Sequence, residues 1–428
     1  MGCNNLSKKW WGFIKDPVFG YVHINDLEKE VIDTQPVQRL RRIKQLAGTD
    51  YVYPGANHTR FEHAIGSMFL AGRLADNLSS LLSPEDIQEL RLASLLHDVG
   101  HGPFSHVFEP LLMKYMNKTH EDMTTWLIQH SELKDLLKEL GFDTKRLGRL
   151  AVGKLNEVKR PFLDQFLRSA VDVDKMDFLV RDSYHTGAEY SVDVFRLIYT
   201  LDIFNGNLSV NLTALHTLEA FIIARVESFK SVYFHKTARA AQLMMVQALE
   251  AAKDECGLVN IKNPLDYLNL DDYTTWTALK NCSASNSIIS ALEKRKLLKS
   301  AYEQIFYTQE EFISNIFVND TVRQEIESEI AQKAGVPVED VFIDVPLVSS
   351  VPYRHSIQLE PMEIPIFMET RDGKKISRRL NDLSKIINLM KGFMNILRVY
   401  TKEQYRDKVS KAAIETLGEP PYSAKISL

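Results

Sequence analysis

The sequence predicts a mainly α-helical protein, in which a helical core precedes a smaller α+β region. Helix-start signals and apolar faces with helical spacing recur between residues 26 and 255, whereas residues 338–369 are rich in Val, Ile, Phe and Pro. The 428 residues are enough for two or three domains. We therefore predict a core of residues 1–255 and a C-terminal region of residues 256–428 that serves oligomerisation or regulation.

Local signals place the elements of the core in chain order. Residues 18–25 alternate enough to predict a short strand pair. Ser83, followed by Pro84 and two acids, predicts a helix start, and the glycines from Gly100 onward predict its end. Residues 161–180 are expected to form one helix, and residues 213–253 one or two long helices.

The C-terminal region has a different pattern. Residues 284–332 are charged and are predicted to be helical, as are residues 379–400. Between them, Asp372-Gly373 follows an apolar stretch and predicts a hairpin turn.

Composition excludes several classes of protein. The 52 basic and 56 acidic residues give a net charge of −4, so a nucleic-acid partner is not expected. No apolar run approaches the roughly 18 residues that span a bilayer, so no membrane partner is expected. The three cysteines lie far apart and form no disulfide framework, which indicates the cytoplasm, with the nucleus as the alternative.

Histidines cluster in one part of the chain, with seven of the twelve between His58 and His130. The apolar run that ends at Leu96 leads directly into His97-Asp98. Burying such an ionisable pair is costly unless it is paired or bound to a metal. The alternative is that Asp98 bonds His97 or terminates the helix.

Two further segments supply residues of the same kind. His63 lies near the start of an apolar-faced helix, and residues 171–177 place three acids in an otherwise apolar helix. We expect Asp174 to point inward and Asp172 and Asp177 to face solvent. Mixed imidazole and carboxylate ligands suit Mn, Fe, Zn, Ni or Mg without selecting one. The candidate metal ligands are His63, His97, Asp98 and Asp174.

The order of these motifs resembles the HD phosphohydrolase superfamily. Over residues 13–240 it is similar, more closely, to the deoxynucleoside triphosphate (dNTP) triphosphohydrolases, which include bacterial dGTPases and the vertebrate SAM-and-HD-domain dNTPase. Only about a dozen residues precede the match, so we expect no SAM domain before it. The similar segments are Asp33-Thr34, Gln38–Arg41, Ile43–Leu46, Tyr53–Ala56, Arg60–His63, His97–His106 and Asp172–Lys175.

The resemblance implies metal-dependent hydrolysis of a dNTP to a deoxynucleoside and inorganic triphosphate. Catalytic roles beside the phosphates are implied for His101, His106 and His120, with His106 protonating the leaving 5′ oxygen. For His120 the alternative is a helix start on the surface. The implied substrate-binding residues are Gln45, Leu46, Arg60, Lys175, Phe178, Asp182, Arg225 and Tyr233.

Those substrate-binding residues divide by the part of the nucleotide they would contact. Arg60, Lys175 and Arg225 match phosphate-contacting positions. Gln45 and Asp182 match the pair that reads the 3′-hydroxyl, while Phe178 would lie beneath the sugar and Tyr233 beside the base. The alternatives are solvated charges for the basic residues and a core position for Tyr233.

The resemblance also implies regulation. Members of this branch are often homo-oligomers, here a dimer or tetramer, activated by GTP or a dNTP. Asp33, Gln38 and Arg41 match activator-binding positions, whereas Gly12 stands where a lysine is expected. Two other functions stay open: an HD phosphohydrolase acting on nucleoside monophosphates or a signalling nucleotide, and a non-catalytic nucleotide sensor.

Overall fold

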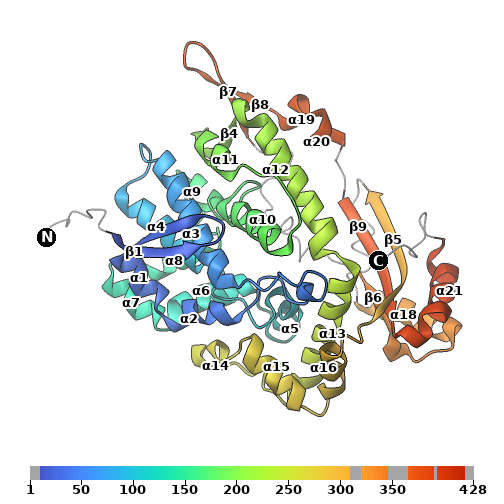
Figure 1. Ribbon diagram of the computed structural model, residues 1–428. Coiled ribbons are helices and arrows are strands. Elements are labelled where there is room, and N and C mark those ends of the chain that lie inside the picture. Colours follow the sequence, from blue (N-terminus) through green and yellow to red (C-terminus); the bar gives the residue numbers. More distant parts are fainter. Residues whose placement is uncertain (1–9, 309–319, 346–364, 390–392, 420–428) are drawn as a thin grey trace.

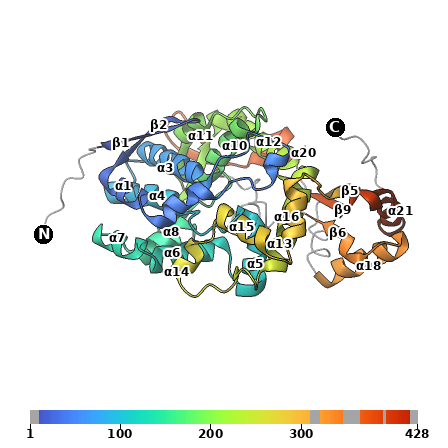
Figure 2. The same cartoon turned by 60° about the horizontal axis from the view of Figure 1, so that its bottom comes forward.

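The computed structural model describes residues 10–308, 320–345, 365–389 and 393–419 (Figure 1). The predicted fold class is confirmed, because helices dominate the chain and the sheets are small. A large helical body holds the N-terminal two thirds of the chain, and β5, β6, β9, α18 and α21 lie together at one side of it (Figures 1 and 2).

The helices of the large body surround one apolar core. Its N-terminal elements are β1 (Trp10–Asp16), β2 (Gly20–Asn25), α1 (Asp26–Ile32), α2 (Gln35–Arg39), α3 (Arg60–Asn77), α4 (Pro84–Leu96), α5 (Glu109–Leu111), α6 (His120–His130), α7 (Leu133–Glu139), α8 (Thr144–Ala151), α9 (Phe162–Gln165) and α10 (Val173–Thr186). They are followed by α11 (Val194–Thr200), β3 (Leu201–Phe204), β4 (Asn207–Asn211), α12 (Leu215–Ser228), α13 (Lys236–Ala252), α14 (Pro264–Leu268), α15 (Asp272–Asn281) and α16 (Asn286–Glu293).

The remaining elements form two groups. β5 (Lys299–Thr308), α18 (Asp320–Ala334), β6 (Val341–Asp344), β9 (Phe393–Thr401) and α21 (Arg406–Leu417) surround a second apolar core. β7 (Ile366–Glu369), β8 (Lys375–Arg378), α19 (Leu380–Leu383) and α20 (Lys385–Leu389) return to the large body, where Ile366, Leu380 and Ile387 join the first core. That core also continues past residue 255, through Leu268 and Leu279 to Leu297. The division after residue 255 stays a prediction.

Several predicted elements are confirmed. α4 begins after Ser83, whose side chain accepts a hydrogen bond from the Asp86 N–H, and ends at Leu96. Residues 213–253 contain the two helices α12 and α13. The Asp372-Gly373 turn joins β7 to β8, with Gly373 at φ +78°.

The predicted single helix over residues 161–180 is wrong. α9 ends at Gln165, and α10 begins only at Val173. Asp172 has extended backbone and caps α10 by accepting a hydrogen bond from the Lys175 N–H. A capping carboxylate therefore starts a new helix where the apolar spacing indicated a continuous one.

The strands differ from the prediction in extent and in place. The N-terminal hairpin pairs β1 with β2 and is longer than the predicted strand pair at residues 18–25. β3 and β4 interrupt the helical core at residues 201–211. β5 and β9 lie in segments predicted to be helical, and there Glu303 and Arg398 face each other across the sheet and form an ion pair. The charges that resembled a solvated helix face are thus a cross-strand pair.

Among the described residues, no helix combines the length and apolarity needed to cross a membrane.

Candidate active site

Ligand atoms of His63, His97 and Asp174 meet at the junction of α3, α4 and α10, all within 4.8 Å of one another. The Nε2 atom of His63 lies 3.1 Å from Oδ1 of Asp174 and 3.2 Å from Nε2 of His97. Asp98 adds its carboxylate, with oxygens 3.6 Å from His63 Nε2 and 3.4 Å from His97 Nε2. The four predicted metal ligands are therefore brought together.

The hydrogen bonds behind the two imidazoles suit a metal site. Nδ1 of His63 lies 2.7 Å from Oδ2 of Asp177, and Nδ1 of His97 lies 2.7 Å from the Ser94 carbonyl oxygen. Each acceptor holds the proton on Nδ1, so the Nε2 lone pair points into the cluster. Once a metal ion displaces the Nε2 protons, two neutral imidazoles and two carboxylates match the charge and the donor set of a divalent transition metal.

Asp172 and Asp177 are both fully buried, so the prediction that they face solvent is wrong. Asp177 receives two hydrogen bonds from Arg181, which also bonds Asp16 at 2.8 Å. This chain needs close contact between α10 and α3, because a Cβ at Gly66 would lie 1.8 Å from Oδ1 of Asp177. The i,i+4 spacing of Asp177 and Arg181 was the available sequence signal for an intrahelical pair.

Electrostatics indicate that the cluster attracts a cation. Burial opposes a charge on His63, yet its hydrogen bonds to Asp174 and Asp177 raise its pKa to about 10. Burial likewise opposes ionisation of Asp98, but Arg60 and the neighbouring histidines hold the pKa of its carboxyl well below the usual range. The carboxylates stay ionised at neutral pH and favour positive charge between them.

A second histidine group lies beside the first. Ligand atoms of His101, His106 and His120 are also within 4.8 Å of one another. Glu109 bonds Nδ1 of both His106 and His120, at 3.1 and 2.8 Å, which leaves the two Nε2 atoms on the other side. Burial opposes a charge on His120, but Glu109 raises its pKa.

The second group is better arranged for an anion than for one metal ion. The rings of His101 and His120 stack 4.1 Å apart at 14°, so their in-plane nitrogens point side by side rather than toward one point. His101 is 2% exposed, and its Nδ1 has no hydrogen-bond partner in the described part of the chain. Parallel donors of this kind suit separate oxygens of a phosphate chain. His120 begins α6 as the alternative reading had it, but it is only partly exposed.

The three predicted phosphate-contacting residues are buried rather than solvated. Arg60 bonds Asp98 and Ser105 between the two histidine groups. Lys175 follows Asp174 and pairs with Asp172. Arg225 lies on α12 and is 4% exposed.

The predicted sugar- and base-side residues form a continuous wall. Asp182 lies two turns along α10 from Asp174, and Tyr233 donates its hydroxyl hydrogen to Asp182. The Phe178 and Tyr233 rings are 6.2 Å apart, and Leu46 packs in a small apolar cluster that includes Tyr233. Oε1 of Gln45 is buried without a hydrogen-bond partner among the described residues, as a group that waits for a ligand would be.

Two residues of the site were missed by the sequence analysis, one in this wall and one in the second histidine group. His58 is 2% exposed and its Nε2 lies 2.7 Å from Asp182, while its ring stacks on His185 at 4.4 Å. Glu109 holds two of the catalytic candidates. Position within the histidine-rich segment was the only signal for His58, and the i,i+3 spacing from His106 the only one for Glu109.

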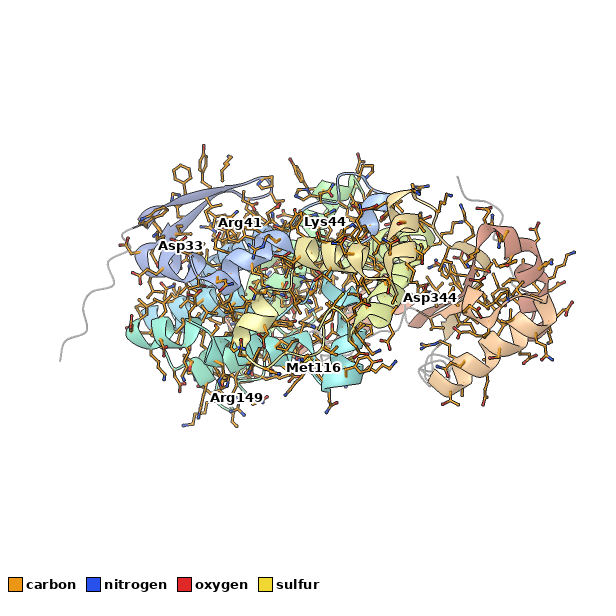
Figure 3. All side chains as sticks on the ribbon, turned by 90° about the horizontal axis from the view of Figure 1, so that it is seen from below. Asp33, Arg41, Lys44, Met116, Arg149 and Asp344 are labelled. Carbon is orange, nitrogen blue, oxygen red and sulfur yellow. The ribbon has the colours of Figure 1, made fainter. Side chains whose placement is uncertain are left out.

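Of the predicted regulatory residues, Asp33 and Arg41 are exposed and Gln38 is half-buried. Asp33 and Arg41 lie along the edge of the molecule that also carries Lys44, opposite Met116 and Arg149 (Figure 3). Asp33 pairs with Lys29, and Arg41 bonds Gln38 and stacks 3.5 Å above the Phe61 ring.

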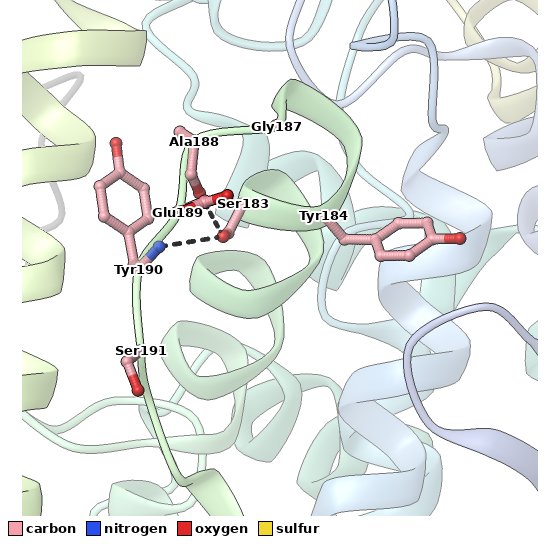
Figure 4. A pocket seen from close by; sticks show the side chains of 7 residues that line it. All are labelled: Ser183, Tyr184, Gly187, Ala188, Glu189, Tyr190 and Ser191. Carbon is pink, nitrogen blue, oxygen red and sulfur yellow. Dashed lines mark hydrogen bonds between the residues drawn. The ribbon is translucent and has the colours of Figure 1, made fainter.

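A surface pocket at the end of α10 contains none of the predicted site residues (Figure 4). The Ser183 hydroxyl closes this loop through the Ala188 carbonyl and the Tyr190 N–H. The lining residues are Ser183, Tyr184, Gly187, Ala188, Glu189, Tyr190 and Ser191.

Comparison with known proteins finds relatives over most of the chain. Residues 60–179 match the HD domain and residues 192–425 match the HD associated region. An uncharacterized protein of Methanocaldococcus jannaschii is 32% identical over 339 residues, which cover 78% of this chain and 68% of that protein. The deoxynucleoside triphosphate triphosphohydrolase SAMHD1 homolog of Dictyostelium discoideum is 31% identical over 340 residues, covering 75% of this chain and 64% of the relative.

A similar fold has been solved experimentally. The crystal structure of a hypothetical protein from Aquifex aeolicus aligns with a TM-score of 0.74 and 28% identity, covering 94% of this chain and 99% of the other.

Proposed function

The chain belongs to the family of HD-domain hydrolases that carry an HD-associated region, and from that premise we propose that it cleaves dNTPs to deoxynucleoside and inorganic triphosphate. One observation carries the proposal: the His63, His97, Asp98 and Asp174 cluster meets the basic, histidine-lined side at Asp98, which contacts Arg60 and His101, and shares α10 with Asp182 of the wall. The protein thus offers adjoining binding surfaces for the phosphate chain and for the sugar of a nucleotide. The similarity to the Dictyostelium triphosphohydrolase supports the substrate class.

The metal would be held by His63, His97, Asp98 and Asp174, and its identity is Mn, Fe, Zn, Ni or Mg. When bound, a divalent ion supplies Lewis acidity, which acidifies water and withdraws charge from a phosphoryl oxygen. The protein keeps both imidazoles in the ligating tautomer through Asp177 and Ser94.

The chain's own residues position the phosphates and move the proton. Arg60, Lys175 and Arg225 offset the negative charge of the triphosphate. His101 and His120 contact phosphate oxygens. His106, whose side chain is 45% exposed and whose Nδ1 is held by Glu109, gives a proton from Nε2 to the leaving 5′ oxygen.

The sugar wall selects the deoxynucleotide. Asp182 and Gln45 bind the 3′-hydroxyl, and Phe178 occupies the space that a 2′-hydroxyl would need. Leu46 and Tyr233 border the base. Because Tyr233 and His58 both bond Asp182, its carboxylate is held in one orientation before substrate arrives.

Regulation belongs to the same proposal. Asp33, Gln38 and Arg41 bind a guanine nucleotide or a dNTP at an interface between subunits of a homodimer or homotetramer. Arg41 rests on Phe61, which adjoins Arg60 at the start of α3, so this surface is connected to the catalytic helix. Residues 256–428 contribute to the assembly.

A nucleotide panel with product analysis tests the activity. The purified protein, loaded with Mn²⁺, is incubated with dGTP, dATP, GTP, dGMP and a cyclic dinucleotide, and its products are separated by ion-exchange chromatography. Release of triphosphate from dNTPs is expected. Hydrolysis of dGMP or the cyclic dinucleotide alone would support another HD phosphohydrolase, and no turnover would support a nucleotide sensor.

A further inference from the structure

The loop between His101 and His106 has an unfavourable backbone. Phe104 and Ser105 lie in the left-handed region, at φ 60° and 56°, where residues with a side chain are disfavoured. Such backbone persists only where the surrounding structure holds it. His101 and His106 lie at the two ends of this loop. The contacts that hold Phe104 and Ser105 therefore determine where the two imidazoles lie.

A carboxylate from outside the HD domain makes the decisive contacts. Asp272, the first residue of α15, accepts a hydrogen bond from the Phe104 N–H at 2.6 Å and another from the Lys44 N–H at 2.9 Å. It is 8% exposed, and Trp276 of the same helix lies against the Phe104 ring at 6.1 Å. Each carboxylate oxygen thus fixes one backbone segment.

Both segments lead directly to the site. Phe104 precedes Ser105, whose hydroxyl accepts from Arg60 at 2.7 Å and donates to the Lys44 carbonyl at 2.6 Å. Lys44 precedes Gln45. Asp272 therefore ties together the histidine loop, the Arg60 side chain and the strand-like segment that presents Gln45.

We propose that Asp272 is a positioning residue, through which the HD-associated region holds the His101–His106 loop and Gln45 in the geometry needed for turnover. The proposal rests on the dNTP hydrolysis proposed above. It assigns the HD-associated region a direct part in the active-site architecture of the same subunit.

The ionised carboxylate of Asp272 lowers the stability of the folded protein, so a role in positioning can be distinguished from a role in stability. Burial raises the pKa of its carboxyl to about 6, although the two backbone N–H groups oppose the shift. An ionised group with a raised pKa is less favourable in the folded protein than in the unfolded chain. The carboxylate is thus retained at a cost to stability, and a neutral isostere need not lower the melting temperature.

The test compares Asp272→Asn with Asp271→Asn. The side-chain amide that replaces the Asp272 carboxylate offers one acceptor oxygen and turns an N–H donor toward the other backbone donor, so one bond is lost. Asp271 is the matched control, because it caps the same helix and pairs with Arg42 without touching the loop. Asparagine is an equally good cap.

For Asp272→Asn we expect kcat for dGTP to fall by about 10- to 100-fold, the range that small misplacements produce. Metal content and melting temperature should stay at the wild-type values, and hydrogen exchange should quicken in peptides that cover residues 43–46 and 101–106. Asp271→Asn should change neither kcat nor exchange in those peptides.

Wild-type kcat or unchanged exchange in Asp272→Asn would overturn the positioning role. Equal losses in both variants would do the same, because they would indicate general damage to α15. If wild-type protein releases no triphosphate, the proposed function fails, and the exchange comparison alone decides whether Asp272 holds the loop.

Discussion

Replacing Asp177 by Asn should weaken metal binding through a residue that contacts no metal. Asp177 accepts from Nδ1 of His63 at 2.7 Å and from two nitrogens of Arg181, both at 2.9 Å. An asparagine amide cannot satisfy all three donors, so the His63 tautomer is no longer fixed. Loss of such a supporting carboxylate reduces metal affinity by about 10- to 100-fold.

The same substitution should also cost stability. Hydrogen bonds to charged groups contribute about 1.5–3 kcal/mol each, and leaving a buried charge unpaired costs more. Arg181 keeps its bond to Asp16 at 2.8 Å, which limits the damage. We therefore expect the free energy of unfolding to fall by about 2–4 kcal/mol.

Competition with a chelator measures the affinity, and urea unfolding measures the stability. Asp16→Asn is the control, because it removes the far end of the same chain without touching His63. It should lower stability while leaving metal affinity unchanged. Wild-type metal affinity in Asp177→Asn would refute the assignment of His63 as a ligand held by Asp177.

Four further outcomes follow from the site. His97→Ala and Asp98→Ala should each lose bound metal and turnover together, measured by elemental analysis and triphosphate release; full metal occupancy in both would contradict the ligand assignment. The ratio of kcat/KM for dGTP over GTP should be about 100, the discrimination that an apolar pocket reaches against one added hydroxyl, and equal values would exclude Phe178 as the discriminating group. Saturating GTP should shift the protein to a larger oligomer, measured by sedimentation, and raise dNTP turnover. Asp33→Ala should weaken both effects and leave the metal content unchanged. If GTP changes neither property of the wild-type protein, the proposed regulatory site is wrong. Because the pKa of Asp272 is raised to about 6, its carboxyl takes up a proton at a higher pH in the folded protein than in the unfolded chain. Below that pH kcat should fall, while this group's contribution to the free energy of unfolding should rise by up to about 3 kcal/mol as the pH approaches 4. The same decrease of kcat at acid pH in Asp272→Asn would contradict this.

The sequence predicted the helical class and the groups that meet at the metal cluster because these depend on local signals. Helix caps such as Ser83 and the adjacent pair His97-Asp98 are readable within a few residues. The substrate-binding, catalytic and regulatory candidates came from the resemblance of the ordered motifs to a known family.

What the sequence did not predict depends on contacts between distant segments. Asp177 was expected in solvent because its partners, Arg181, Asp16 and His63, become neighbours only when α10 packs on α3. Arg39 stands in a locally basic segment, yet it is fully buried and donates to the carbonyl oxygens of His101 and Leu270, which lie far from it in sequence. The strand β9 was mistaken for helix because its partners lie on either side of it in the sheet, more than 50 residues away in sequence.

Hydrolysis of dGTP in ¹⁸O-labelled water tests the central claim most directly, because it reports which bond breaks and where water adds. Attack of water at the α-phosphorus should give unlabelled deoxyguanosine and triphosphate that carries one ¹⁸O, as measured by mass spectrometry. Label in the deoxyguanosine, products that are dGMP with pyrophosphate or dGDP with phosphate, or no turnover at all, would contradict the account.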